Sequence, residues 1–154
     1  MLDTSALAKV YHQERGSEFL DWLLHRERTG LFLSRLGMLE MHSVVSGKLR
    51  SGETTREASE LARRRFRSDV RNSRFKIVVP RLRHYEIAET LLAAYGTTHG
   101  LRSLDSLQLA VALDLRRDGV VESFVASDKI LIRVALLESL PVINPETANL
   151  PNIF

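Results

Sequence analysis

The sequence predicts an α/β fold with a central parallel β-sheet that is flanked by helices on both faces. Short apolar segments of strand character alternate with amphipathic helical segments along the 154 residues, and such alternation is typical of parallel sheets. No internal repeat, linker or low-complexity tract interrupts this pattern, and the length is most simply that of one domain. We therefore expect a single domain over residues 1–154.

The N-terminal half is expected to contain four helices and two strands. Segments 5–11 and 17–27, separated by Gly16, have helical apolar periodicity, and 31–34 has the character of a short buried strand. A helix over 36–52 should stop at Gly52, and a polar helix over 54–73 has Thr55 as its N-cap. The β-branched and aromatic segment 74–80 predicts a second strand.

The C-terminal half repeats the alternation of helix and strand. A helix over 82–96 is expected to end near Gly96, and a helix over 101–119 is expected to stop at Gly119. Segment 120–127 predicts a strand, 128–140 a helix and 141–145 a last short strand.

Composition excludes several classes of protein. The chain has no cysteine, so it has no disulfide, no thiolate zinc site and no cysteine nucleophile. No apolar run approaches the roughly 20 residues that cross a bilayer, and no basic-then-apolar signal segment opens the chain. We expect a cytoplasmic protein without a membrane partner.

Four acidic residues occupy equivalent places in the predicted pattern. Asp3 and Asp128 each follow a strand and begin an apolar helix, Asp105 lies in the first turn of its helix, and Glu40 lies about one turn into the helix after strand 31–34. In a parallel α/β sheet these positions gather at the edge where ligands bind. Each acid alone has a simpler interpretation, as a helix cap, a partner of the helix dipole or an exposed glutamate.

Four converging carboxylates would repel one another unless a cation offset their charge. Mg²⁺ or Mn²⁺ suits such oxygen ligands and promotes hydrolysis of phosphodiesters. Between positions 48 and 83 the chain also has 12 Lys or Arg against 4 Asp or Glu, which favours an anionic partner. Acids, a metal ion and a basic surface together indicate a nuclease.

The basic stretch contains an arginine pattern with helical spacing. Arg63, Arg67, Arg71 and Arg74 are separated by 4, 4 and 3 positions, so they are predicted to share one helix face. That face is interpreted as an RNA contact, as a solvated surface or as part of a partner interface. Arg102, before the helix of Asp105, is a candidate for binding a phosphate or pairing with a carboxylate.

Four blocks of the sequence resemble those of PIN-domain proteins, and most of all VapC-type toxins of bacterial toxin–antitoxin pairs. They are "LDTSALAKVY", "EMHSVVSGKL", "LRSLDSLQLAVAL" and "FVASDKILIRVALLESLPVINP", and together they cover nearly the whole chain. The resemblance implies a parallel sheet flanked by helices and metal-dependent cleavage of RNA. It also implies a homodimer and a cognate antitoxin that covers the acidic pocket.

The family's acidic quartet falls on Asp3, Glu40, Asp105 and Asp128. By the same resemblance these residues would be catalytic and would bind Mg²⁺ or Mn²⁺, while Thr4 or Ser5 would orient the first carboxylate or a metal-bound water. Ser127 is a further supporting candidate.

The chain departs from the family pattern in two places. Only Met1 and Leu2 precede Asp3, so either the first strand is unusually short or the true start lies upstream. Gln108 stands where many relatives have histidine, which we interpret as tolerated variation. Alternative functions are a non-catalytic PIN-like module that binds RNA or an antitoxin, a receiver domain, and a haloacid-dehalogenase-like phosphatase. The phosphatase would need a second aspartate where Ser5 stands.

Overall fold

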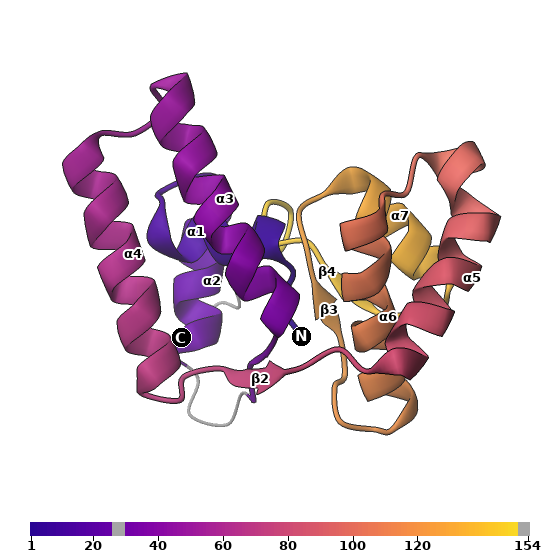
Figure 1. The fold of residues 1–154 in the computed structure, drawn as a ribbon. Coiled ribbons are helices and arrows are strands. Elements are labelled where there is room, and N and C mark those ends of the chain that lie inside the picture. The colour runs from indigo at the N-terminus through magenta and orange to yellow at the C-terminus, as the bar shows by residue number, and fades with distance from the viewer. Residues whose placement is uncertain (26–29, 151–154) are drawn as a thin grey trace.

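The computed structural model describes residues 1–25 and 30–150 of the chain. This part contains seven helices and four short strands, and none of the helices is long and apolar enough to cross a bilayer. In chain order the elements are α1 (Thr4–Tyr11), α2 (Ser17–Leu24), β1 (Phe32–Ser34), α3 (Arg35–Ser51), α4 (Arg56–Arg71), β2 (Lys76–Val78), α5 (Leu82–His99), α6 (Ser103–Arg117), β3 (Phe124–Val125), α7 (Lys129–Leu137) and β4 (Val142–Ile143). Helices α1–α4 lie on one side of the strands and α5–α7 on the other (Figure 1).

All the strand pairs are parallel, as predicted. β1 pairs with β2 and β3 pairs with β4, so the described strands form two small sheets. Leu2 joins them, because it forms a one-residue parallel bridge to Leu33 on one side and to Val125 on the other. Strand conformation ends there because the next residue, Asp3, caps α1. The α/β class is confirmed, whereas one continuous central sheet covered on both faces stays a prediction.

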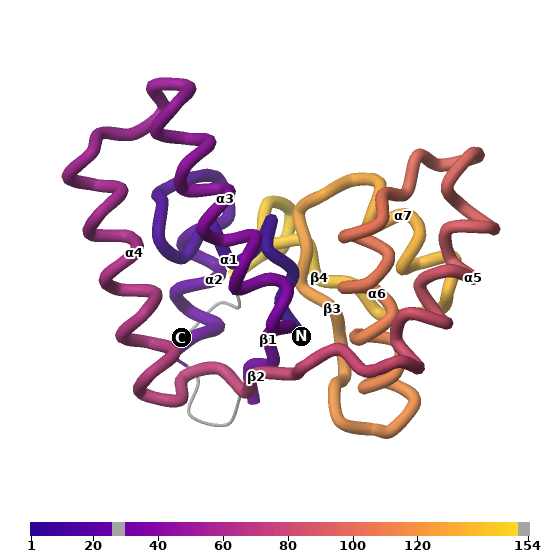
Figure 2. Tube along the Cα trace, in the orientation of Figure 1, coloured from indigo at the N-terminus to yellow at the C-terminus, as the bar shows by residue number. Residues whose placement is uncertain are grey.

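Alternate residues of these strands pack into two different hydrophobic clusters. This alternation follows from strand geometry, in which successive side chains point to opposite faces. One set packs with residues of α5, α6 and α7, namely Met1, Phe32, Val78, Phe124 and Val142. The other set packs with residues of α1, α2, α3 and α4, namely Leu2, Leu33, Ile77, Val125 and Ile143. The N-terminal residues therefore lie in the middle of the molecule, as the trace in Figure 2 shows.

Several predicted helix ends agree with the structure, whereas others do not: α7 ends at Leu137, before the predicted position 140. α3 ends at Gly52 in the left-handed conformation, and the Thr55 side chain caps α4 by accepting from the N–H of Ala58 at 3.2 Å. The predicted end of α5 near Gly96 is wrong, because the helix continues to Gly100, whose φ is +73°. A glycine inside a helix costs only about 1 kcal/mol, which packing can offset. Residues 26–27 of the second predicted helix lie outside the described residues.

Candidate active site

Asp3 lies at the N-cap of α1 and is 3% exposed. Its Oδ2 accepts two hydrogen bonds from Ser5, one from the backbone N–H at 2.9 Å and one from the hydroxyl at 2.5 Å. Burial raises the pKa of Asp3, the hydrogen bonds from Ser5 oppose that rise, and the negative charge of Asp105 adds to it. Burial therefore makes ionisation of this carboxylate costly, and a nearby cation would reduce that cost.

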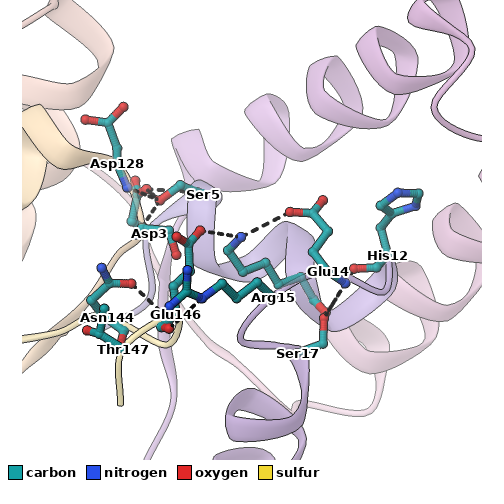
Figure 3. Close-up of polar contacts among 12 residues, drawn as sticks. Asp3, Ser5, His12, Glu14, Arg15, Ser17, Asp128, Asn144, Glu146 and Thr147 are labelled. Atoms are coloured by element: carbon teal, nitrogen blue, oxygen red, sulfur yellow. Dashed lines mark hydrogen bonds and ion pairs between the residues drawn. The ribbon is translucent and has the colours of Figure 1, made fainter.

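Ser5 connects Asp3 to the start of α7. Its Oγ accepts from the backbone N–H groups of Ser127 at 2.9 Å and Asp128 at 3.2 Å while it donates to Asp3. Asp128 caps α7, since its Oδ1 accepts from the N–H of Leu131 at 2.9 Å. Figure 3 shows Asp3, Ser5 and Asp128 side by side. The capping interpretation is thus correct for both aspartates, and it leaves each carboxylate a second oxygen.

Ser127 supports this arrangement through its backbone. Its N–H donates to Ser5, whereas its own Oγ is buried without a hydrogen-bond partner among the described residues. The structure therefore provides an orienting contact for the Ser127 amide and none for its hydroxyl.

Glu40 projects from α3 toward the start of α1. Its Oε2 accepts from the Thr4 hydroxyl at 2.8 Å and from the Gln108 amide, which also donates to Thr4 Oγ1 at 3.0 Å. Burial raises the pKa of Glu40, the hydrogen bond from Thr4 opposes the rise, and the charges of Asp3 and Asp105 add to it. Thr4 thus orients Glu40, whereas Ser5 orients Asp3.

Asp105, in the first turn of α6, is paired with an exposed arginine. The Nε of Arg102, which is 72% exposed, donates to Asp105 Oδ2 at 3.0 Å, and another guanidinium nitrogen lies 3.9 Å from Asp128 Oδ2. Burial raises the pKa of Asp105, the Arg102 interaction lowers it, and the charge of Asp128 raises it. Arg102 is the cation of this cluster, in agreement with its predicted pairing with a pocket carboxylate.

The four acids therefore act electrostatically on one another without forming a finished metal site. Within residues 1–25 and 30–150, no three His, Cys, Asp or Glu side chains are arranged so that they could hold a metal ion. Each inner carboxylate is instead held by a neighbour: Asp3 by Ser5, Glu40 by Thr4, and Asp105 by Arg102. The donor set still fits Mg²⁺ or Mn²⁺, because it consists of carboxylate oxygens in an excess of negative charge.

The predicted arginine stripe is only partly present. Arg63 turns toward α3, where it contacts His42 Nδ1 at 3.0 Å and Ser46 Oγ at 2.8 Å. The placement of Arg74 on the same helix face is wrong, because α4 ends at Arg71 and Arg74 instead pairs with Asp69 at 3.4 Å. Arg67 and Arg71 remain exposed on α4.

A buried lysine at the far end of α1 was not predicted. Lys9 is 6% exposed and pairs with Glu14 at 3.0 Å and with Glu146 at 2.8 Å. Lys48 of α3 pairs with Glu14 at 2.5 Å. This network connects α1, which begins at Asp3, to α3, which carries Glu40, and to the C-terminal segment. The periodicity of "SALAKVY" marks a helix and does not show which of its polar residues is buried.

A mostly apolar groove lies beside the part of α3 that carries Glu40. Its apolar lining comes from Leu36, Met38, Leu39, Val79, Pro80, Tyr85 and Leu107, and Arg35 and His42 also line it. Two of the lining residues are strongly exposed, since Leu39, next to Glu40 in the sequence, is 68% exposed and Tyr85 is 51% exposed. Such a concentration of exposed apolar side chains is typical of an interaction surface.

Comparison with known proteins identifies one family. A family model described as the PIN domain matches residues 1–137, a range that runs from the N-terminus to the end of α7 and contains all four acidic residues. No curated protein gives a significant match to the chain.

Proposed function

The chain belongs to the PIN domain family, and from this premise we propose that it is a metal-dependent endoribonuclease that hydrolyses RNA phosphodiester bonds. The PIN domain is generally a nuclease fold. The observation that supports the proposal is the electrostatic coupling of four acids from α1, α3, α6 and α7. Asp105 raises the pKa of both Asp3 and Glu40, and the guanidinium of Arg102 lies 3.0 Å from Asp105 and 3.9 Å from Asp128. Clustered acids with perturbed pKa values are characteristic of catalytic sites.

Asp3, Glu40, Asp105 and Asp128 would hold the Mg²⁺ or Mn²⁺ ion. When bound, the ion supplies a Lewis acid for the phosphodiester and lowers the pKa of the attacking water. The protein contributes orientation, because Ser5 fixes Asp3 and Thr4 fixes Glu40 through the hydrogen bonds described above. Arg102 is exposed beside Asp105, so its guanidinium can exchange a carboxylate for a substrate phosphate.

RNA contact outside the acidic cluster is assigned to α4. Arg67 and Arg71 are exposed on this helix, where Arg67 Nε donates to the Arg63 carbonyl at 3.3 Å. Arg63 and Arg74 are instead engaged by side chains of the protein. Exposed arginines of this kind attract a phosphate backbone independently of sequence.

The biological role that we propose is that of the toxin in a VapBC-type toxin–antitoxin pair. A cognate antitoxin would cover the acidic residues, and the toxin would act on RNA in the cytoplasm. We also propose that a second copy of the chain covers the groove beside α3, since its exposed Leu39 and Tyr85 suit a homodimer interface. We further propose that the two small sheets form one central sheet, joined through the bridges of Leu2 to Leu33 and Val125. The whole chain, residues 1–154, would form a single domain.

The second candidate is a non-catalytic PIN-like module that binds RNA or an antitoxin. One observation favours it: in the described part of the chain, no three potential ligands are arranged to hold a metal ion. Arg102 already offsets the charge of Asp105. In such a module the arginine would be a permanent replacement for the cation.

The two candidates differ in cleavage of end-labelled total RNA by the purified protein. We expect cleavage with Mg²⁺ or Mn²⁺, none with EDTA, and a loss of at least about 100-fold in the Asp105→Asn variant, the upper range for groups that support a metal ion. Asp21→Asn, which alters an exposed carboxylate on α2, is the matched control and should cleave normally. RNA binding without cleavage by the wild-type protein would establish the binding module instead.

A further inference from the structure

Gln108 lies at the centre of a hydrogen-bond network that joins three helices. It is 1% exposed on α6, and its Nε2 donates to Thr4 Oγ1 on α1 and to Glu40 Oε2 on α3. Its other polar atom, Oε1, is buried and has no hydrogen-bond partner among the described residues. The nitrogen of this amide therefore donates two hydrogen bonds, whereas its oxygen accepts none from the described residues.

The chemistry of the partners determines which way the amide points. Glu40 as a carboxylate can only accept, and the single hydroxyl proton of Thr4 is already donated to Glu40. Neither oxygen can therefore donate to Gln108, so the amide group that faces them is the nitrogen, which donates to both. The buried Oε1 without a partner is the consequence, and an unsatisfied buried acceptor destabilises a fold. The buried amide of Gln108 therefore costs stability at its oxygen, while its nitrogen joins Thr4 and Glu40.

The chain leaves room for this amide at Gly37. A Cβ atom at position 37 would lie 3.2 Å from Gln108 Oε1, 3.3 Å from Thr4 Oγ1 and 3.0 Å from Leu33 Cδ1. All three distances are tighter than ordinary contacts. Helix α3 can therefore approach the network closely only because this residue has no side chain.

We propose that Gln108 is a positioning residue: together with Thr4 it holds Glu40 by Oε2, so that Glu40 Oε1 is presented to the catalytic metal ion. No hydrogen bond to Glu40 Oε1 occurs among the described residues, whereas Oε2 accepts two. Groups that orient a ligating carboxylate in this way change metal affinity without touching the ion. The inference rests on the proposed function and assigns a role to a residue outside the acidic quartet.

The test is the affinity of the metal-free protein for Mn²⁺, measured by calorimetry. Gln108→Met keeps the length of the side chain and removes both hydrogen bonds, so it should weaken Mn²⁺ binding by about 10-fold or more. The matched control is Gln13→Met, at an exposed glutamine, which should bind Mn²⁺ like the wild type. Thermal unfolding without metal should remain cooperative in both variants, which separates positioning from loss of the fold.

Thr4→Val tests the same oxygen without altering the buried amide. We expect it to weaken Mn²⁺ binding as well, and the double variant with Gln108→Met should lose less than the sum of the two single changes, because both act on one carboxylate. Gln108→His should recover part of the affinity, since an imidazole N–H can donate to Glu40.

The possible failures are distinguishable. Equal Mn²⁺ affinity of Gln108→Met and wild type would overturn the role of Gln108 and leave the proposed nuclease in place. A wild-type protein that binds no Mn²⁺ would overturn the metal site and, with it, both proposals. If Gln108→Met does not fold, Thr4→Val decides alone, and an unchanged affinity there would refute the positioning of Glu40 by this network.

Discussion

The two ends of α6 carry carboxylates in opposite surroundings, a half-buried Asp105 and a buried Asp114. Asp105, in the first turn, has one cationic partner, the exposed Arg102, and shares its space with the charge of Asp128. Asp114, in the last turn, is fully buried and pairs with Arg83 at 2.5 Å, with Arg117 and with His84 at 2.9 Å.

The polarity of the Asp114 cluster follows from its hydrogen bonds. His84 Nδ1 accepts from the backbone N–H of Arg81 at 2.9 Å, so in the neutral imidazole Nε2 carries the proton and donates to Asp114. Burial raises the pKa of Asp114, but the His84 hydrogen bond and the charges of Arg83 and Arg117 outweigh it, and the pKa lies below its ordinary value. For Asp105 the balance is reversed, and the pKa lies above its ordinary value.

The two carboxylates therefore differ in how far the protein itself neutralises them. Asp114 is paired with two arginines and His84, so it links the start of α5 to the end of α6. Asp105 and its neighbours keep negative charge that Arg102 offsets only in part, which is a cost to the fold unless a ligand reduces it. The comparison therefore supports a structural role for the C-terminal end of α6, and it is consistent with the proposed metal site at the N-terminal end.

The largest contrast is expected in RNA cleavage. Asp105→Asn should lower cleavage by at least about 100-fold, whereas Asp114→Asn should leave the rate of the folded protein within about two-fold, because surface and structural changes away from a site rarely alter its chemistry. The measurement is cleavage of labelled RNA with Mn²⁺ at a temperature where both variants are folded. Equal losses in the two variants would remove the distinction between the two ends of the helix.

The free energy of unfolding should show the opposite contrast, with the larger loss in Asp114→Asn and not in Asp105→Asn. Asp114→Asn keeps the shape of the side chain and removes the charge that pairs with two arginines and His84, so it should cost about 1–3 kcal/mol, the range for hydrogen bonds to charged groups. Both arginines are about half exposed or more, so solvent reduces their share of that cost. Urea unfolding of the variant and of wild type measures the difference, and an unchanged midpoint would contradict the structural role.

The sequence predicted the acidic residues around Asp105 better than it predicted the cluster around Asp114. Asp3 and Asp128 were recognisable because each follows a strand and begins an apolar helix, and both do cap their helices. Asp114 gave no signal, because its partners His84 and Arg83 lie about 30 residues away and helical spacing does not specify which helices pack together. Gln108 was interpreted as tolerated variation for the same reason, since its contacts with Thr4 and Glu40 span 104 and 68 residues.

Local patterns also failed where a helix end depends on packing. Gly96 is a plausible stop, yet α5 continues one more turn to Gly100. The stripe that included Arg74 assumed that α4 continues past Arg71, whereas Ser73 has a positive φ of 57° that ends the helix. The parallel arrangement of the strands was predictable from the alternation of helices and strands. The sequence showed that only Met1 and Leu2 precede Asp3, but it did not show that strand pairing there is reduced to a one-residue bridge at Leu2.

The pH dependence of stability should differ in sign between the two ends. The pKa of Asp105 is raised on folding, so its carboxylate destabilises the metal-free protein above that pKa and ceases to do so as the pH falls toward the ordinary value of 3.8. Asp105→Asn should therefore stabilise the metal-free protein at pH 7, by less than about 1 kcal/mol because Arg102 offsets part of the repulsion, and the gain should vanish near pH 4.

Asp114 should behave in the reverse way. Its pKa is lowered, so its contribution is complete above the ordinary value of 3.8 and is lost as the pH falls through the lower, folded pKa. The loss caused by Asp114→Asn should accordingly be largest at neutral pH and should shrink only in strongly acidic solution. Thermal unfolding of both variants across pH 3–7 without metal measures the two curves, and curves of the same sign would contradict the assignment.

The smallest expected effect concerns Arg102. This arginine pairs with Asp105 at one end of α6, as Arg83 pairs with Asp114 at the other end. Because Arg102 pairs with Asp105 and approaches Asp128, it competes with a metal ion for the same carboxylates. An exposed ion pair is worth about 0.2–1 kcal/mol, so Arg102→Gln should strengthen Mn²⁺ binding by up to about five-fold, whereas Arg83→Gln should not change it. Calorimetric titration of the two variants with Mn²⁺ in the absence of RNA separates this competition from any contact of Arg102 with substrate. Weaker Mn²⁺ binding in Arg102→Gln would mean that the arginine orients the carboxylates for the ion. The carboxylates at both ends of α6 would then be fully paired by protein groups, and the contrast between Asp105 and Asp114 would be wrong.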